Sequence, residues 1–211
     1  RRVLFRSGQA HSFSKINNYD DFKNHIPVRD YEDLREYFEQ IKEGKKNILW
    51  PGKPLYLAVT SGTTSGSKYI PITKQSLPNH LNGAKIALLM YVAETGKVDF
   101  INGKFIFIQG SPVLSKISGI LTGRLSGISA HHIPFYMKKN MLPSWSTNII
   151  EEWENKIESI VKETIEANMT IISGIPSWLQ MYFEKIVNKT NKKVSEIFPN
   201  FNLLVYGGVN F

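Results

Sequence analysis

The sequence predicts an α/β fold in which helices pack on a layered, largely parallel sheet. Short runs rich in β-branched and aromatic residues alternate with longer stretches in which apolar residues recur every three or four positions. A helix that joins two strands favours parallel pairing, because the crossover carries the chain back before the next strand starts. The chain has 211 residues, of which 42% are hydrophobic and 21% are charged, as in ordinary folded proteins.

The first hundred residues contain two predicted helices and a pair of strands. Tyr31, Leu34, Phe38 and Ile41 fall on one face at helical spacing, and Gly44 follows them. In order, the predicted elements are a helix over residues 31–43 capped by Asp30, a strand over 55–60, a loop over 61–67, a strand over 69–73, and a helix that starts at Thr73 or Ser76, tolerates Pro78 in its first turn and ends before Gly96.

The second half continues the alternation of strands and helices. Residues 110–146 contain three prolines and no clear period, so we expect them to be irregular. The predicted elements around this stretch are a buried strand over 105–108, a helix capped by Thr147 and closed by Asn168, a strand over 170–172, a turn at Gly174, a helix over 176–188 and a buried strand over 203–206.

Composition and charge exclude several classes of protein. There is no cysteine, which rules out disulfides and thiolate metal sites and fits a cytoplasmic location, and no apolar run is long enough to cross a membrane. The net charge of +8 is concentrated in residues 51–150, but the lysines there are scattered and do not alternate with aromatic residues. We therefore expect a nucleotide site or a solvated basic surface, and no nucleic-acid or membrane partner. His131 and His132 lack nearby acidic partners in the sequence, so we expect no metal site.

Both ends of the sequence are abrupt. We expect residues 1–7 to be a leader foreign to the fold, and residues 8–211 to form part of an N-terminal domain. The chain stops at Phe211, where a predicted strand enters a glycine loop, so we expect it to be a fragment of a longer enzyme.

The most informative segment is the loop at residues 60–68, Thr-Ser-Gly-Thr-Thr-Ser-Gly-Ser-Lys. Glycines let backbone N–H groups turn toward an anion, hydroxyl groups add donors, and Lys68 supplies a cation, so the composition favours phosphate binding. The spacing differs from that of a Walker loop, and the run after Lys68 cannot begin a regular helix. A flexible hairpin loop would explain the glycines, but it explains the hydroxyl groups and the lysine poorly.

Residues 61–71 resemble the phosphate loop of adenylate-forming enzymes, in the form found in the Gretchen Hagen (auxin-responsive promoter) family of acyl-acid amido synthetases and their bacterial relatives. Three further stretches are similar to segments of that family and occur in the same order: residues 26–52, residues 173–178 and residues 207–211. Four ordered matches are far more specific than one loop.

The resemblance implies an incomplete N-terminal domain of an adenylate-forming enzyme and a reaction in two steps. A carboxylic acid is activated by ATP and Mg²⁺ as an acyl-adenylate, and an amine or amino acid then takes the acyl group. The implied cofactor-binding residues are Ser61, Gly62, Thr63, Thr64, Ser65, Gly66, Ser67, Lys68, Gly207, Gly208, Val209, Asn210 and Phe211. The implied acyl-binding residues are Ser173, Gly174, Ile175, Pro176, Ser177 and Trp178.

The family's catalytic lysine, its ribose-binding aspartate and the acid that holds Mg²⁺ are expected beyond Phe211, so we expect little turnover from these 211 residues alone. Two alternatives remain open at this point. One is an acyl-CoA ligase of the same superfamily, in which a thiol replaces the amine. The other is a non-catalytic nucleotide-binding domain that has kept the loop.

Overall fold

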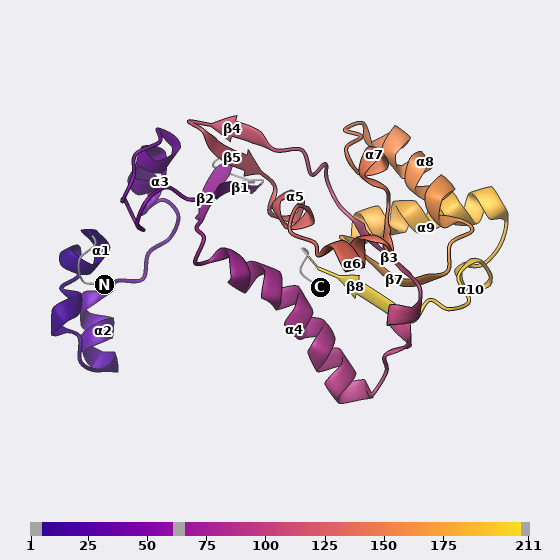
Figure 1. Cartoon of the computed structure of the whole chain (residues 1–211), viewed down its shortest axis with the longest axis horizontal. Helices are drawn as coiled ribbons and strands as arrows, with labels where there is room; N and C mark the ends of the chain where they lie inside the picture. The colour runs from indigo at the N-terminus through magenta and orange to yellow at the C-terminus, as the bar shows by residue number, and fades with distance from the viewer. Residues whose placement is uncertain (1–5, 61–65, 208–211) are drawn as a thin grey trace. The chain divides into compact units, whose positions relative to one another are not determined.

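The computed structural model describes residues 6–60 and 66–207, and the chain divides into two compact units (Figure 1). The first unit comprises residues 1–80 and 114–128, and the second comprises residues 81–113 and 129–211. The predicted α/β class is confirmed. Its sheet is divided in two, because each unit builds its own four-stranded sheet. Among the described residues, no helix is both long and apolar enough to cross a membrane.

The sheet of the first unit has the strand order β2-β1-β5-β4 and is mixed. Strand β1 pairs with β2 antiparallel and with β5 parallel, and β5 pairs with β4 antiparallel. Its strands are β1 (Tyr56–Thr60), β2 (Lys68–Ile72), β4 (Ser115–Ile117) and β5 (Ile120–Gly123). The helical segments that precede it are α1 (Arg6–Ala10), the 3-10 helix η2 (Phe13–Lys15), α2 (Tyr19–His25) and α3 (Arg35–Lys42).

The β4–β5 hairpin corrects the expectation that residues 110–146 are irregular. Ser118 and Gly119 both adopt positive φ, at 48° and 80°, and Ile117 pairs with Ile120 across them. A two-residue turn with positive φ at both positions matches the twist of a hairpin. The strands are only three and four residues long, so their sequence shows little alternation. Short helices fill much of the rest of this stretch: α5 (Leu125–Ala130), α6 (Phe135–Lys138) and α7 (Trp145–Asn148).

Helix α3 packs on the first sheet through the side chains that the sequence placed on one face. Phe38 and Ile41 are buried with Leu57 of β1 and Ile120 of β5. The predicted start of this helix is wrong. Residues 31–34 form a turn in which Asp30 and Asp33 exchange backbone-to-carboxylate hydrogen bonds, and the α-helix begins at Arg35.

Helix α4 (Leu77–Thr95) begins where the sequence predicts. The Thr73 backbone N–H donates to the Ser76 hydroxyl at 3.0 Å, and the Ser76 N–H donates to the Thr73 hydroxyl at 3.1 Å. These two hydrogen bonds close the turn at residues 73–76 that leads into the helix, and Pro78 is tolerated in the first turn because it has no N–H to satisfy.

The sheet of the second unit has the strand order β6-β3-β7-β8, and all its strands are parallel. The strands are β3 (Lys104–Ile108), β6 (Met141–Leu142), β7 (Met169–Gly174) and β8 (Leu203–Tyr206). The remaining helices of this unit are the 3-10 helix η3 (Asp99–Asn102), α8 (Trp153–Thr164), α9 (Pro176–Thr190) and α10 (Val194–Ile197). The prediction of parallel strands joined by helices is therefore correct for this unit.

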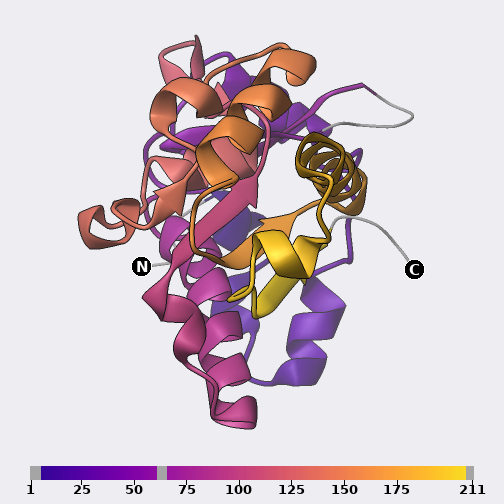
Figure 2. The same ribbon diagram turned by 90° about the vertical axis from the view of Figure 1, so that its right-hand side faces the viewer.

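Helices α8 and α9 bury the core of the second unit against β3 and β7. Ile106 and Ile172 of the sheet belong to one hydrophobic cluster with Ile160 of α8 and Tyr182 of α9, and all four side chains are almost fully buried. The turned view shows β8, in yellow, beside the orange β7 (Figure 2). Residues of β3 and β7 belong to this core.

Two further expectations about this unit are wrong. Thr147 lies inside the short helix α7, and the cap of α8 is Glu152, whose carboxylate accepts from the N–H groups of Glu154 and Asn155. Strand β8 is not buried, since Leu204, Val205 and Tyr206 are 41–54% exposed. Within residues 6–60 and 66–207 it lies at the edge of the sheet and pairs with β7 alone.

Candidate functional site

The predicted phosphate loop joins β1 and β2, as the sequence indicates. Thr60 and Lys68 face each other in register at its two ends. Ser61, Gly62, Thr63, Thr64 and Ser65 lie outside the described residues. Gly66 has a φ of 80°, a conformation that favours glycine, and Ser67 is exposed. The described end of the loop therefore has the backbone freedom on which the prediction depends.

Tyr31 holds Lys68 and the start of β2. The Lys68 ammonium lies 5.1 Å from the centroid of the Tyr31 ring, and the Tyr31 hydroxyl accepts the Tyr69 backbone N–H at 3.0 Å. A cation over an aromatic face is attracted without being neutralised. The sequence placed Tyr31 only on a packing face, and the 38-residue separation from Tyr69 left no local signal for this second role.

Two lysines in this region have different charge environments. Lys42 lies 4.5 Å from the Tyr69 ring centroid and 2.9 Å from the Glu39 carboxylate. The hydrogen bond to Glu39 raises the pKa of Lys42 and compensates its charge. Lys68 forms no ion pair with any carboxylate in the part of the chain that the structure describes. The charge of Lys68 is therefore available to an anion at the end of the loop.

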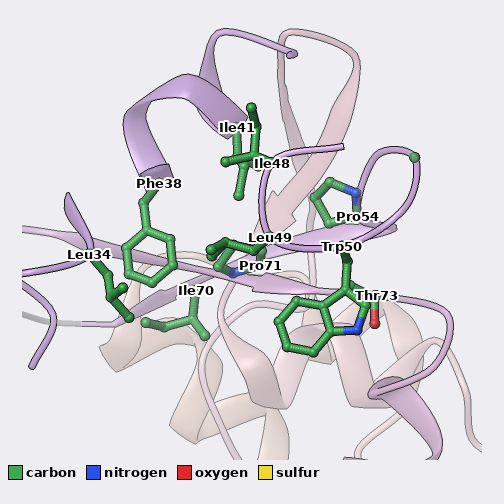
Figure 3. A pocket seen from close by; sticks show the side chains of 11 residues that line it. Leu34, Phe38, Ile41, Ile48, Leu49, Trp50, Pro54, Ile70, Pro71 and Thr73 are labelled. Carbon is green, nitrogen blue, oxygen red and sulfur yellow. The ribbon is translucent and has the colours of Figure 1, made fainter. Parts of the chain in front are cut away.

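An apolar cavity of about 220 Å³ lies between α3, the segment 48–54 and β2 (Figure 3). Phe38 and Ile41 enter it from α3, and Pro71 enters it from β2. Its lining offers Thr73 as a polar side chain and no charged group. The cavity therefore suits an apolar group of about one ring and not a polyphosphate.

The second unit brings two separately predicted segments to one edge of its sheet. Gly174, the last residue of β7, is in register with Tyr206, the last residue of β8, so Gly207 follows at the same edge. Ile108, which ends β3, is in register with Gly174 on the other side. Open parallel sheets bind ligands at the carboxyl ends of their strands, so this edge is the expected place for a ligand. Gly208, Val209, Asn210 and Phe211 lie outside the described residues.

The turn after β7 is shaped by close packing. A Cβ on Gly174 would lie 3.1 Å from the Ile108 carbonyl oxygen, closer than most real Cβ contacts. Ile175 is extended, and Pro176 occupies the first turn of α9, where its missing N–H costs nothing. Ser173, Gly174, Ile175 and Pro176 thus form a tight strand-to-helix turn, with Ser177 exposed beyond it.

Trp178 stacks on Trp153, with ring centroids 4.6 Å apart and planes inclined by 28°. Both indoles pack against the core of the second unit. An acyl-binding role for Trp178 therefore stays a prediction beside its observed packing role.

His131 places Nε2 2.9 Å from the Pro112 carbonyl oxygen and its ring against Trp145. Over residues 6–60 and 66–207, no three His, Asp or Glu side chains gather as metal ligands would.

Comparison with solved structures matches this architecture to acyl acid amido synthetases. A structure of AtGH3.15 in complex with 2,4-DB has a TM-score of 0.61 over 92% of this chain, at 17% identity, and a second structure of GH3.15 acyl acid amido synthetase has a TM-score of 0.60 over 89%. These matches cover 37% and 35% of the solved chains. At such identity they establish the fold alone.

Two curated relatives are indole-3-acetic acid-amido synthetases from Arabidopsis thaliana. GH3.15 is 35% identical over 74 residues, or 34% of this chain, and GH3.5 is 31% identical over 121 residues, or 55% of this chain. The chain matches 12% and 19% of the lengths of these relatives.

A family model described as the GH3 family N-terminal domain matches residues 6–151, which is more than half of the chain. The matched residues include α3, the β1–β2 hairpin with Lys68, and strand β3. This confirms the family that the four ordered motifs resemble. The chain therefore belongs to the GH3 family.

Proposed function

We propose that a protein containing this chain is an ATP-dependent ligase that joins a carboxylic acid to an amine or amino acid. The observation that carries the proposal is the environment of Lys68 in a GH3 family chain. Its ammonium stands at the end of a loop rich in hydroxyl groups and is held by the Tyr31 ring without a described carboxylate partner. Such a group suits the phosphates of a nucleotide.

The reaction that we propose has two steps. A carboxylate oxygen attacks the α-phosphorus of ATP, the bond to the leaving pyrophosphate breaks, and an acyl-adenylate forms. The amine nitrogen then attacks the acyl carbon, the bond to AMP breaks, and the amine loses a proton. Transfer at phosphorus depends on positioning and on neutralising charge, and Lys68 and the loop donors would contribute both. Mg²⁺ would add charge neutralisation at the phosphate oxygens, which it prefers as ligands.

Two segments of the second unit are proposed as further binding segments. We propose that Ser173–Trp178 contact the acyl group and that Gly207 and the residues after it contact the adenine. The proposal is supported by the pairing of Gly174 with Tyr206, which brings Gly174 and Gly207 to the carboxyl edge of the parallel sheet. Because the relatives are named indole-3-acetic acid-amido synthetases, and one solved structure holds 2,4-DB, we propose an aromatic carboxylic acid as substrate.

The test of the product uses the full-length protein that contains this chain. It is incubated with ATP, Mg²⁺, a panel of aromatic carboxylic acids and the twenty amino acids, and products are identified by mass spectrometry. We expect an amide and AMP. A coenzyme A thioester without any amide would contradict the choice of acceptor, and neither product with any acid would contradict the ligase proposal.

The test of the site is ATP affinity with a matched pair of lysine variants. Lys68→Ala removes the cation at the end of the loop, and we expect at least tenfold weaker ATP binding. Lys74→Ala removes the same charge from an exposed position six residues further along and is expected to bind ATP within twofold of wild type. Equal losses in both variants would show that only the overall charge matters.

A further inference from the structure

We propose that Gln109 is a ligand-binding residue whose side-chain oxygen accepts a hydrogen bond from an N–H or O–H group of the substrate. Gln109 follows β3 and is 4% exposed. Its Oε1 is buried, and no donor in the described part of the chain lies within hydrogen-bond distance. The proposal rests on the proposed function. It adds to that function one binding residue and the kind of group, a hydrogen-bond donor, that this residue binds.

A buried acceptor without a donor is unusual in a folded protein. More than nine in ten buried polar groups are paired, so an exception calls for an explanation. A glutamine at this position loses its hydrogen bonds to water on folding and gains none at Oε1 from the described residues. An apolar side chain of similar length would avoid that cost. A ligand donor would compensate it.

The position of Gln109 links it to the proposed site. Ile108 is in register with Gly174, so the chain leaves β3 at the same edge as β7 and β8. Neighbouring strands are about 4.8 Å apart, which places Gln109 and Gly207 on the order of 10 Å from each other along this edge. A nucleoside or an amino acid could bridge part of that distance. All these residues belong to the second unit.

Because Oε1 accepts a hydrogen bond, only a substrate group with an N–H or O–H can bind to it. An ionised carboxylate and the phosphates of ATP offer mainly acceptor oxygens, so they cannot satisfy Oε1. The nucleoside part of ATP carries amino and hydroxyl donors, and the amine substrate carries N–H donors. Both share the chemistry that Oε1 requires. With its oxygen in this position, Gln109 binds a donor group of the nucleoside or of the amine.

The experiment measures the binding of three probes to the full-length protein that contains this chain by calorimetry: adenosine, glycinamide and tripolyphosphate. Gln109→Met keeps the length of the side chain and removes the acceptor. We expect about tenfold weaker binding of adenosine or of glycinamide, and tripolyphosphate binding within twofold of wild type. The control Gln180→Met makes the same change at an exposed position of α9, and we expect no change for any probe.

The variant Gln109→Glu distinguishes the two candidate donors, the nucleoside part of ATP and the amine substrate. It keeps an acceptor and adds a negative charge, so it should strengthen glycinamide binding if the amine is the donor and largely preserve adenosine binding if the nucleoside is. Unchanged affinities of all probes in Gln109→Met would overturn the proposal. Equal loss of all three probes would do the same, because removing an acceptor that pairs with donor groups should spare tripolyphosphate.

Thermal unfolding of Gln109→Met supplies a second readout. The proposal predicts a variant that is at least as stable as wild type in the absence of ligand, because the unpaired acceptor is gone; a purely structural glutamine predicts a less stable variant that binds every probe normally. A wild-type chain that binds tripolyphosphate but neither adenosine nor glycinamide would refute the role of Gln109 and leave the phosphate site intact. A wild-type chain that binds none of the probes would refute the proposed site and Gln109 with it.

Discussion

Replacing the buried lysine of the second unit tests the electrostatics of its core. Lys156 of α8 is 2% exposed, and its ammonium donates to the Asn148 carbonyl oxygen at 2.6 Å. In the described residues, no carboxylate forms an ion pair with it. Burial lowers the pKa of Lys156 from 10.5 to about 8. Lys156→Met removes the buried charge and retains most of the apolar side chain.

The magnitude follows from the pKa difference. A drop from 10.5 to about 8 corresponds to roughly 3 kcal/mol between the charged and neutral forms, and solvent screening reduces it to about 2 kcal/mol. The lost hydrogen bond to Asn148 costs about 1 kcal/mol. We therefore expect Lys156→Met to raise the free energy of unfolding at pH 7 by about 1 kcal/mol.

The pH dependence of unfolding tests, independently of the value at pH 7, whether the buried charge of Lys156 destabilises the fold. Between pH 8 and 10.5 the unfolded chain holds the Lys156 proton and the folded chain does not, so this group makes the wild type more stable as pH rises through that window. The free energy of unfolding of Lys156→Met should not show this increase with pH. Measurements stop at pH 9.5, because burial raises the pKa of Tyr182, and above pH 10 that group lowers stability as pH increases.

The assay is urea unfolding at pH 7.0, 8.5 and 9.5, followed by tryptophan fluorescence. Three of the four tryptophans lie in the second unit, so the signal reports mainly on the core that contains Lys156. Lys162→Met, an exposed position on the same helix, is the control and should change little. A Lys156→Met variant that is less stable than wild type at pH 7, with an unchanged slope, would refute the reasoning.

Two further predictions concern the packing and charge of the second unit. Gly103→Ala places a Cβ that overlaps the Thr170 methyl group and lies 2.5 Å from the Asn168 carbonyl oxygen, so we expect a loss of about 2–4 kcal/mol in urea unfolding; Gly83→Ala meets open space inside α4 and should gain up to about 1 kcal/mol. Glu163 is partly buried, which would raise its pKa, but hydrogen bonds from Ser144 and Thr147 outweigh burial and lower it. This carboxylate stabilises the fold above its unfolded pKa and loses that contribution as pH falls through the lowered value, so Glu163→Gln should cost about 1–2 kcal/mol at pH 7 and less at pH 3. A cost of Glu163→Gln that does not depend on pH, or a Gly103→Ala variant as stable as wild type, would contradict these two assignments.

Local patterns correctly predicted several helices and strands in both units. The strands on both sides of residues 61–67, the Thr73–Ser76 cap and helix α9 each depend on neighbouring residues, and they were correctly predicted. The hairpin of β4 and β5 was not predicted, because each strand is too short to show alternation and the turn depends on positive φ at Ser118 and Gly119.

Long-range features could not be predicted from local patterns. The contact of Tyr31 with Tyr69 joins residues far apart in sequence, and the exposure of β8 depends on its edge position in the sheet. The division into two sheets has the same origin, since it follows from pairings such as β1 with β5. Gln109 carries no motif, and only its burial without a partner draws attention to it.

The most direct measurement of the central claim is ATP–pyrophosphate exchange by the full-length protein that contains this chain. Exchange of labelled pyrophosphate into ATP reports formation of the acyl-adenylate before any amine is added. We predict exchange that requires a carboxylic acid, falls at least tenfold in Lys68→Ala and persists in Lys74→Ala. Exchange that is absent with every carboxylic acid, or that is equally high in Lys68→Ala, would contradict the account.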